Sequence, residues 1–144
     1  MKIPDQILKI CYAHGIAKSP EEACGIITEK LEVYPMPNIM NKYHKLNPKE
    51  YPRTNLDGYM IDPIGLTKLE AKLNQQGDKI EVIYHTHPKG ETYFSEMDKE
   101  IALLNEPFYP GIHYLVCSIK DEKHNGAILA VFNQTKGDFD IINI

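Results

Sequence analysis

Residues 79–105, which read KIEVIYHTHPKGETYFSEMDKEIALLN, contain the pattern that decides the fold. Apolar and polar residues alternate over the first part, and this period of two predicts a strand over residues 79–87. The same alternation places His85 and His87 on one face of that strand. Pro88 has no N–H to donate to a sheet, so we expect strand pairing to end there.

Further helices and strands are predicted around this strand. Ser95 is a favourable N-cap, and the residues after it predict a helix that runs to about Asn105. Elsewhere the patterns predict helices over residues 4–15 and 62–77, closed by Gly15 and Gly77, strands over residues 24–28, 31–34, 113–119, 127–133 and 139–144, and irregular structure between Pro35 and Pro63. This order predicts an α/β fold in which a mixed β-sheet is flanked by helices.

The composition is that of an ordinary globular protein. The 144 residues are 42% hydrophobic and 25% charged, which excludes disordered and fibrous classes and predicts a single domain over residues 1–144. The net charge of -4, with lysines and arginines scattered among more numerous acids, argues against a nucleic-acid partner. No stretch approaches the roughly 20 apolar residues of a membrane span, so no membrane partner is expected.

The cysteines indicate a reducing compartment. Cys11, Cys24 and Cys117 are an odd number without close spacing, which is a poor disulfide framework. The sequence therefore predicts free thiols and a cytoplasmic protein. Cys24 is expected to pack in the core, and a redox-sensitive thiol beside Glu22 is the alternative.

The two histidines and a later aspartate form a candidate metal site. On a strand, His85 and His87 have Cα atoms about 7 Å apart, so both imidazoles can reach one ion. The loop after Pro88 can bring Asp98, in the first turn of the next helix, over the same place. Two nitrogens and one carboxylate oxygen leave a fourth position for water, which is typical of catalytic rather than structural zinc.

Each part of this candidate site also has a simpler interpretation. A His-x-His pair can form the polar face of a sheet, and Ser95 with Asp98 can serve as a capping box alone. Neither explanation accounts for the pair and the cap sharing one short loop, so the metal site is favoured. A proton acceptor for the activated water is then expected, and Glu22 is the candidate, with a solvated surface acid as the alternative.

Two motifs resemble those of the JAMM metalloproteases, also called the Mov34 or MPN-plus group. That family carries Pro-x-Glu-x-Cys-Gly and, further on, His-x-His-Pro, six residues and Ser-x-x-Asp. This chain has the first motif over residues 20–25 and the second over residues 85–98, with every spacing kept. The resemblance covers about residues 3–134 and is strongest to compact prokaryotic members. Two departures are visible: Thr86 stands where serine is common, and Phe94, where many members have proline, is expected to alter the loop beside the scissile bond.

The resemblance implies a cytidine-deaminase-like three-layer fold and about one zinc ion per chain. It implies that His85, His87 and Asp98 bind this zinc, that Glu22 is the general acid/base and that Ser95 helps to stabilise the oxyanion. The implied reaction is hydrolysis of a peptide or isopeptide bond after the C-terminal Gly-Gly of a ubiquitin-like or sulfur-carrier protein with the β-grasp fold.

Two other functions stay open at this stage. One is a peptidase of the phage tail-assembly type from the same family, and the other is a metal-free scaffold of the same fold. The complete set of mechanistic residues disfavours the scaffold. A homodimer is compatible with the sequence, which does not decide the oligomeric state.

Overall fold

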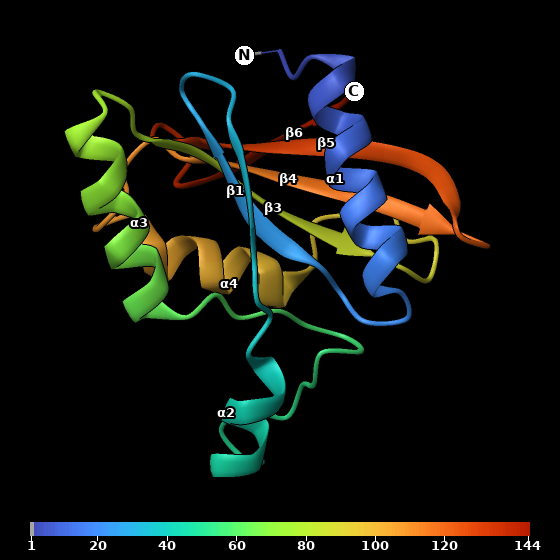
Figure 1. Cartoon of the computed structure of the whole chain (residues 1–144). Helices are drawn as coiled ribbons and strands as arrows, with labels where there is room; N and C mark the ends of the chain where they lie inside the picture. The colour runs from blue at the N-terminus through green and yellow to red at the C-terminus, as the bar shows by residue number, and fades with distance from the viewer. Residues whose placement is uncertain (1) are drawn as a thin grey trace.

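Residues 2–144 are described by a computed structural model, in which six strands form one mixed sheet (Figure 1). The strands are β1 (Cys24–Thr28), β2 (Val33–Met36), β3 (Ile80–His87), β4 (His113–Lys120), β5 (Lys123–Asn133) and β6 (Asp138–Asn143). Their order across the sheet is β2-β1-β3-β4-β5-β6. β3 and β4 are parallel, and the other neighbouring pairs are antiparallel. The strand that carries the two histidines therefore lies inside the sheet, between β1 and β4.

Helices cover both faces of this sheet. α1 (Asp5–Lys18) lies on one face, α3 (Pro63–Gln75) and α4 (Glu96–Asn105) lie on the other, and α2 (Met40–Leu46) projects away from the body (Figure 1). Two buried clusters follow this division, one joining α1 to the sheet and the other joining α3 and α4 to it. The expected three-layer α/β fold, with a mixed sheet flanked by helices, is confirmed. Among residues 2–144, each helix is too short or too polar to cross a bilayer.

The helices of the second layer begin where the sequence predicts. The side chain of Asp62 accepts a hydrogen bond from the backbone N–H of Ile64, and Pro63 occupies the first turn of α3. Leu66, Leu69 and Leu73 then form the buried stripe of this helix. Ser95 caps α4 and so sets the residue at which this helix begins.

Gly15 does not end α1, contrary to the sequence prediction. The helix continues to Lys18, and Gly15 is buried within it. A Cβ at this position would lie 2.5 Å from the side chains of both Thr86 and Ile119. Gly15 therefore allows α1 to approach β3 and β4 closely. This tertiary contact cannot be recognised from residues that usually end a helix.

The segment from Pro35 to Pro63 is less irregular than predicted. Residues 38–47 contain no proline, and α2 forms within them. Pro35 lies in β2, which is an edge strand and so has one side free of sheet pairing. The remainder of this segment runs back toward the sheet, where Asn38 and Ile61 form an isolated bridge.

Candidate metal and active site

His85 and His87 lie at the end of β3, on the side of the sheet covered by α4. Both side chains are buried, and their Nε2 atoms are 3.1 Å apart. β3 places them together because alternate residues of a strand share a face. The parallel partner β4 and the antiparallel partner β1 hold the strand on both edges. The predicted convergence of the two imidazoles is therefore present.

Asp98 joins the histidines through the N-terminal turn of α4. Its Oδ2 atom lies 3.2 Å from Nε2 of His85 and 3.3 Å from Nε2 of His87. Ser95 fixes this carboxylate, since the Ser95 N–H donates to Asp98 Oδ2 and the Asp98 N–H donates to Ser95 Oγ, each at 3.0 Å. The predicted capping box is thus present, and it also orients the Asp98 carboxylate toward the two histidines.

The three converging atoms fit a metal ion. A tetrahedral zinc with bonds of about 2.0–2.1 Å needs ligand atoms about 3.3 Å apart, which the separations of 3.1, 3.2 and 3.3 Å match. Burial alone would raise the pKa of Asp98, but His85 and His87 hold it well below its usual range, so the carboxylate is ionised. Two imidazole nitrogens and one carboxylate oxygen are a donor set that zinc accepts readily.

Glu22 lies beside this cluster, two residues before the start of β1. Its carboxylate and the two imidazoles each offer an atom within 4.8 Å of the others. The Glu22 N–H donates to the carbonyl of Asn55 at 2.7 Å, and the Asn38 side chain donates to the carbonyl of Glu22 at 2.9 Å. Both backbone polar groups of Glu22 are therefore held, and its side chain lies close to the two histidines.

The carboxyl of Glu22 has the environment of a proton acceptor. Glu22 is 6% exposed, and its Oε1 atom has no hydrogen-bond partner among residues 2–144. Burial raises the pKa of this carboxyl, and the nearby His85 and His87 offset the rise only in part. A buried carboxylate without a partner is costly, so this oxygen is available for a group that enters the site.

A cavity of about 180 Å³ opens onto these residues. Glu22, His87 and Ser95 line its inner wall, while two loops supply its mouth: Arg53, Leu56 and Asp57 from one, and Pro88, Lys89, Glu91 and Tyr93 from the other. The sequence did not point to Arg53 or Tyr93. Both lie in loops without periodicity, and no local pattern signals their contact with the site.

Phe94 and Cys24 lie near the site but do not line its cavity. The Phe94 ring packs 5.2 Å from that of Phe139 and 6.0 Å from that of Tyr114, so it anchors the loop to the core. The Cys24 thiol is fully buried in a hydrophobic cluster, and burial raises its pKa to about 12. This supports the packing interpretation of Cys24 over a reactive thiolate.

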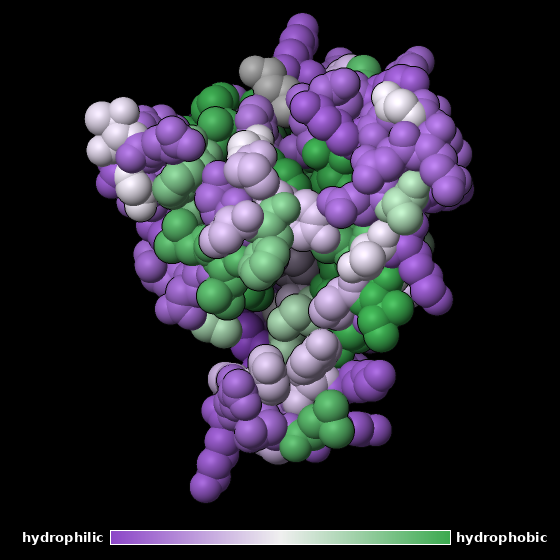
Figure 2. Space-filling view, turned by 90° about the vertical axis from the view of Figure 1, so that its left-hand side faces the viewer, coloured by the Kyte–Doolittle hydropathy of each residue, from purple (hydrophilic) through white to green (hydrophobic). Residues whose placement is uncertain are grey.

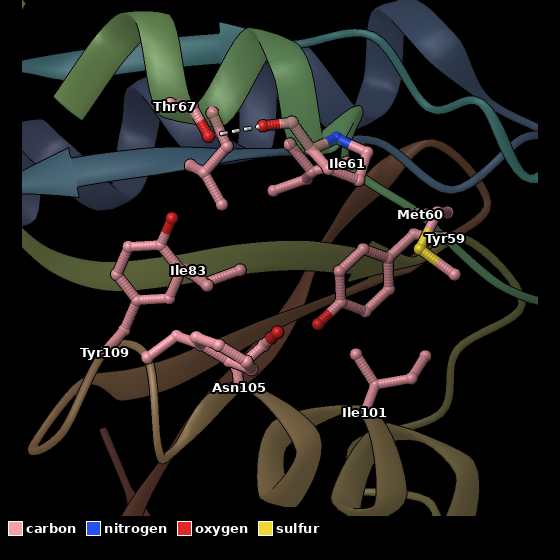
Figure 3. A pocket seen from close by; sticks show the side chains of 11 residues that line it. Tyr59, Met60, Ile61, Thr67, Ile83, Ile101, Asn105 and Tyr109 are labelled. Atoms are coloured by element: carbon pink, nitrogen blue, oxygen red, sulfur yellow. Dashed lines mark hydrogen bonds between the residues drawn. The ribbon is translucent and has the colours of Figure 1, made fainter. Parts of the chain in front are cut away.

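A second and larger cavity, of about 270 Å³, lies between α3 and α4. Figure 2 shows the face of the molecule that α3 forms, on which hydrophobic side chains gather around the middle. Figure 3 shows the side chains of Tyr59, Ile83, Asn105 and Tyr109 in the walls of the cavity. Tyr59 connects the two regions, because its ring stacks on the imidazole of His85 with centroids 4.3 Å apart.

The chain is similar to known proteins in sequence. A family model described as prokaryotic homologs of the JAB domain matches residues 4–130. A probable TtuB-protein conjugate cleaving protease from Thermus thermophilus is 29% identical over 109 residues, which are 74% of this chain and 66% of that protein. Desampylase from Haloferax volcanii is 25% identical over 114 residues, which are 79% of this chain and 74% of that protein. The matched region thus spans about two thirds of the first relative.

Solved structures share the fold. The solution structure of protein DSY2949 from Desulfitobacterium hafniense has a TM-score of 0.69 at 19% identity, covering 95% of this chain and 86% of that one. A solution structure from Salinibacter ruber has a TM-score of 0.62 at 21% identity, covering 100% and 90%. The fold and the family match agree with the motifs over residues 20–25 and 85–98. This chain belongs to the prokaryotic homologs of the JAB domain, the family that its JAMM motifs indicate.

Proposed function

We propose that this protein is a zinc-dependent hydrolase that cleaves the peptide or isopeptide bond after the C-terminal Gly-Gly of a ubiquitin-like or sulfur-carrier protein. The observation that carries the proposal is the convergence of His85 Nε2, His87 Nε2 and Asp98 Oδ2 beside the buried, unpartnered carboxyl of Glu22. His85, His87 and Asp98 would hold the zinc, about one ion per chain. When bound, zinc supplies a Lewis acid that polarises the scissile carbonyl and acidifies water.

Glu22 is the residue that moves the proton. Its carboxylate accepts a proton from the attacking water and delivers it to the leaving amine, so one group acts first as base and then as acid. The raised pKa of this carboxyl brings it closer to the working pH of such a catalyst. The hydrogen bonds to the backbone of Glu22 keep the carboxylate at the site throughout.

Ser95 can both cap α4 and donate a hydrogen bond during the reaction. Its Oγ atom accepts from the Asp98 N–H, and this leaves the hydroxyl proton free to donate. Ser95 is buried and lines the cavity of the site. A donor in this position stabilises negative charge that develops on the carbonyl oxygen during attack.

The names of the relatives and the shape of the site support the substrate. One relative is named for cleaving TtuB-protein conjugates and the other is named desampylase. Leu56 and Tyr93 line a cavity of only about 180 Å³. Glycine residues pass where a side chain would clash, so a Gly-Gly tail can enter while the folded β-grasp body stays outside.

We further infer that residues 1–144 form a single JAMM domain that works in a reducing, cytoplasmic compartment. All strands between residues 2 and 144 belong to one sheet, which supports one folding unit. Cys11, Cys24 and Cys117 are buried free thiols, which supports the reducing compartment. The expected partner is the ubiquitin-like substrate rather than nucleic acid or a membrane.

The experiment uses fusions of β-grasp proteins from the same organism. Fusions with Gly-Gly before a C-terminal extension or a lysine-linked adduct are incubated with the zinc-loaded enzyme, and the products are weighed by mass spectrometry. We expect cleavage after the second glycine that stops on adding a zinc chelator. Ala-Ala tails and Glu22→Gln enzyme are the matched controls. Equal cleavage of both tails, or cleavage that survives the chelator, would overturn the proposal.

A further inference from the structure

The metal-binding histidines lack the hydrogen bonds that usually orient such side chains. A histidine that binds metal through one ring nitrogen almost always donates from the other to a carboxylate, a carbonyl or water. Here the Nε2 atoms face the metal site, and the Nδ1 atoms of both His85 and His87 are buried without a partner among residues 2–144. For His85, a contact with an aromatic ring can fix the plane of the imidazole.

Tyr59 supplies that contact for His85. The two rings are stacked, with centroids 4.3 Å apart and planes 20° from parallel, and both residues are buried. The ring of His87 meets His85 at a different angle, with centroids 4.9 Å apart and planes 66° apart. The His85 imidazole is thus in contact with an aromatic ring across its face and with the second histidine at an edge.

The backbone around Tyr59 is held firmly enough to position a ring. The side chain of Asn38 donates to the carbonyl of Gly58 at 3.0 Å and accepts from the N–H of Met60 at 3.1 Å. The carbonyl of Met60 accepts from the N–H of Ile39 at 2.9 Å. The residues on both sides of Tyr59 are therefore fixed to the segment that precedes α2.

The hydroxyl of Tyr59 does not take part in the stack. Figure 3 shows it directed toward Asn105, on the wall of the 270 Å³ cavity between α3 and α4. This oxygen has no hydrogen-bond partner in the described part of the chain. The ring and the hydroxyl can therefore be tested separately by substitution.

We propose that Tyr59 is a positioning residue that holds the imidazole plane of His85 toward the metal by stacking, in place of a hydrogen bond donated by Nδ1. This inference rests on the proposed zinc site. Losing the groups that orient a metal-binding histidine typically lowers metal affinity about 10- to 100-fold. Tyr59→Leu should show a loss of this size, whereas Tyr59→Phe keeps the ring and should bind zinc as the wild type does.

The measurement is zinc affinity by competition with a chromophoric chelator, together with the visible absorption spectrum of the cobalt-substituted protein. Tyr59→Leu should alter the cobalt spectrum because the ligand geometry changes. Leu66→Ala is the matched control, since Leu66 lines the same cavity and packs in the same cluster but belongs to a different helix. It should lower the unfolding temperature and leave the cobalt spectrum unchanged.

The outcomes separate the two proposals. Wild-type protein that binds no zinc would overturn the proposed function itself. Wild type that binds zinc, with Tyr59→Leu showing equal affinity and an unchanged cobalt spectrum, would overturn the positioning role alone.

If Tyr59→Leu does not fold, Tyr59→Met replaces it, because methionine adapts to irregular gaps. If neither folds, the carbon-bound ring protons of His85 decide by NMR: upfield shifts in wild type and Tyr59→Phe support the stack, and ordinary shifts refute it.

Discussion

The hydroxyl oxygen of Thr86 accepts a hydrogen bond from the backbone N–H of Ala23 at 2.9 Å, and the Thr86 N–H donates to the Ala23 carbonyl at 3.0 Å. Thr86 lies between the two histidines, and Ala23 directly follows Glu22. The two hydrogen bonds therefore join β3, which carries His85 and His87, to the segment that carries Glu22. The hydroxyl needed for this tie is common to threonine and serine.

Thr86→Val should lower activity while leaving zinc binding intact. Valine keeps the volume but removes the acceptor, so the buried Ala23 N–H loses its partner at a cost of about 1–3 kcal/mol. We expect a lower unfolding temperature and a lower kcat, with unchanged zinc content by metal analysis. Thr86→Ser is the control and should retain most of the activity. A Thr86→Val enzyme with wild-type kcat would show that the tie does not position Glu22.

His87→Ala and Glu22→Gln should separate metal binding from proton transfer. His87→Ala removes one of the three converging ligands, so the purified protein should lose its zinc. Glu22→Gln should retain zinc and lose turnover by about 100-fold or more, since it removes the general base. Metal analysis and kinetics on the same preparations check both. Full activity in Glu22→Gln would refute the role assigned to Glu22.

Ser95 tests whether one residue caps the helix and assists the reaction. Ser95→Ala should cost about 1 kcal/mol of stability through loss of the cap. If the hydroxyl also donates to the oxyanion, kcat falls about 100-fold with a smaller change in KM, and this is the outcome we expect. Ser95→Gly is the control, because glycine costs an N-cap only a few tenths of a kcal/mol. A normal kcat in this variant would leave Ser95 with the capping role alone.

Gly15→Ala should destabilise the protein although alanine is the better helix former. The helix itself would gain about 1 kcal/mol. The added Cβ would meet Thr86 and Ile119 at 2.5 Å, and overpacking of this kind typically costs about 1–3 kcal/mol. Denaturant unfolding should show a net loss of stability. A more stable variant would mean that α1 shifts freely on the sheet.

Asp78 should make stability depend on pH in the acidic range. Burial raises the pKa of Asp78, but hydrogen bonds from Thr28 and from the backbone N–H groups of Lys79 and Lys30 lower it overall. A folded pKa below the unfolded value of about 3.8 means that the stabilisation is complete above that pH. It is lost as the pH falls through the folded pKa. The stability difference between wild type and Asp78→Asn should therefore shrink toward low pH, and a constant difference would contradict this.

Much of the fold, and the convergence of His85, His87 and Asp98, follows from local pattern. The alternation that ends at His87 and the N-cap at Ser95 depend on neighbouring residues alone, so the strand, the helix and their contacts could be predicted. Ser95 and Asp98 form the capping box that the sequence offers as the simpler interpretation. The roles proposed for these residues in metal binding and catalysis require no change in this local pattern.

The residues that sequence reasoning missed depend on contacts between distant segments. Tyr59 reaches His85 across 26 positions of the chain, and Arg53 reaches the site from a proline-rich loop. Gly15 was assigned to a helix end because glycine commonly stands there, whereas its contact with Ile119 exists only in the folded sheet. No residue spacing in the sequence indicates contacts of this kind between distant segments.

The shared use of Asp98 by a helix cap and a metal cluster links local order to ligand occupancy. An ion that engages Asp98 Oδ2 also favours the conformation in which the first turn of α4 is closed. A ligand that binds only the folded form shifts the opening equilibrium by mass action. Amide hydrogen exchange in that turn should therefore slow when zinc is added.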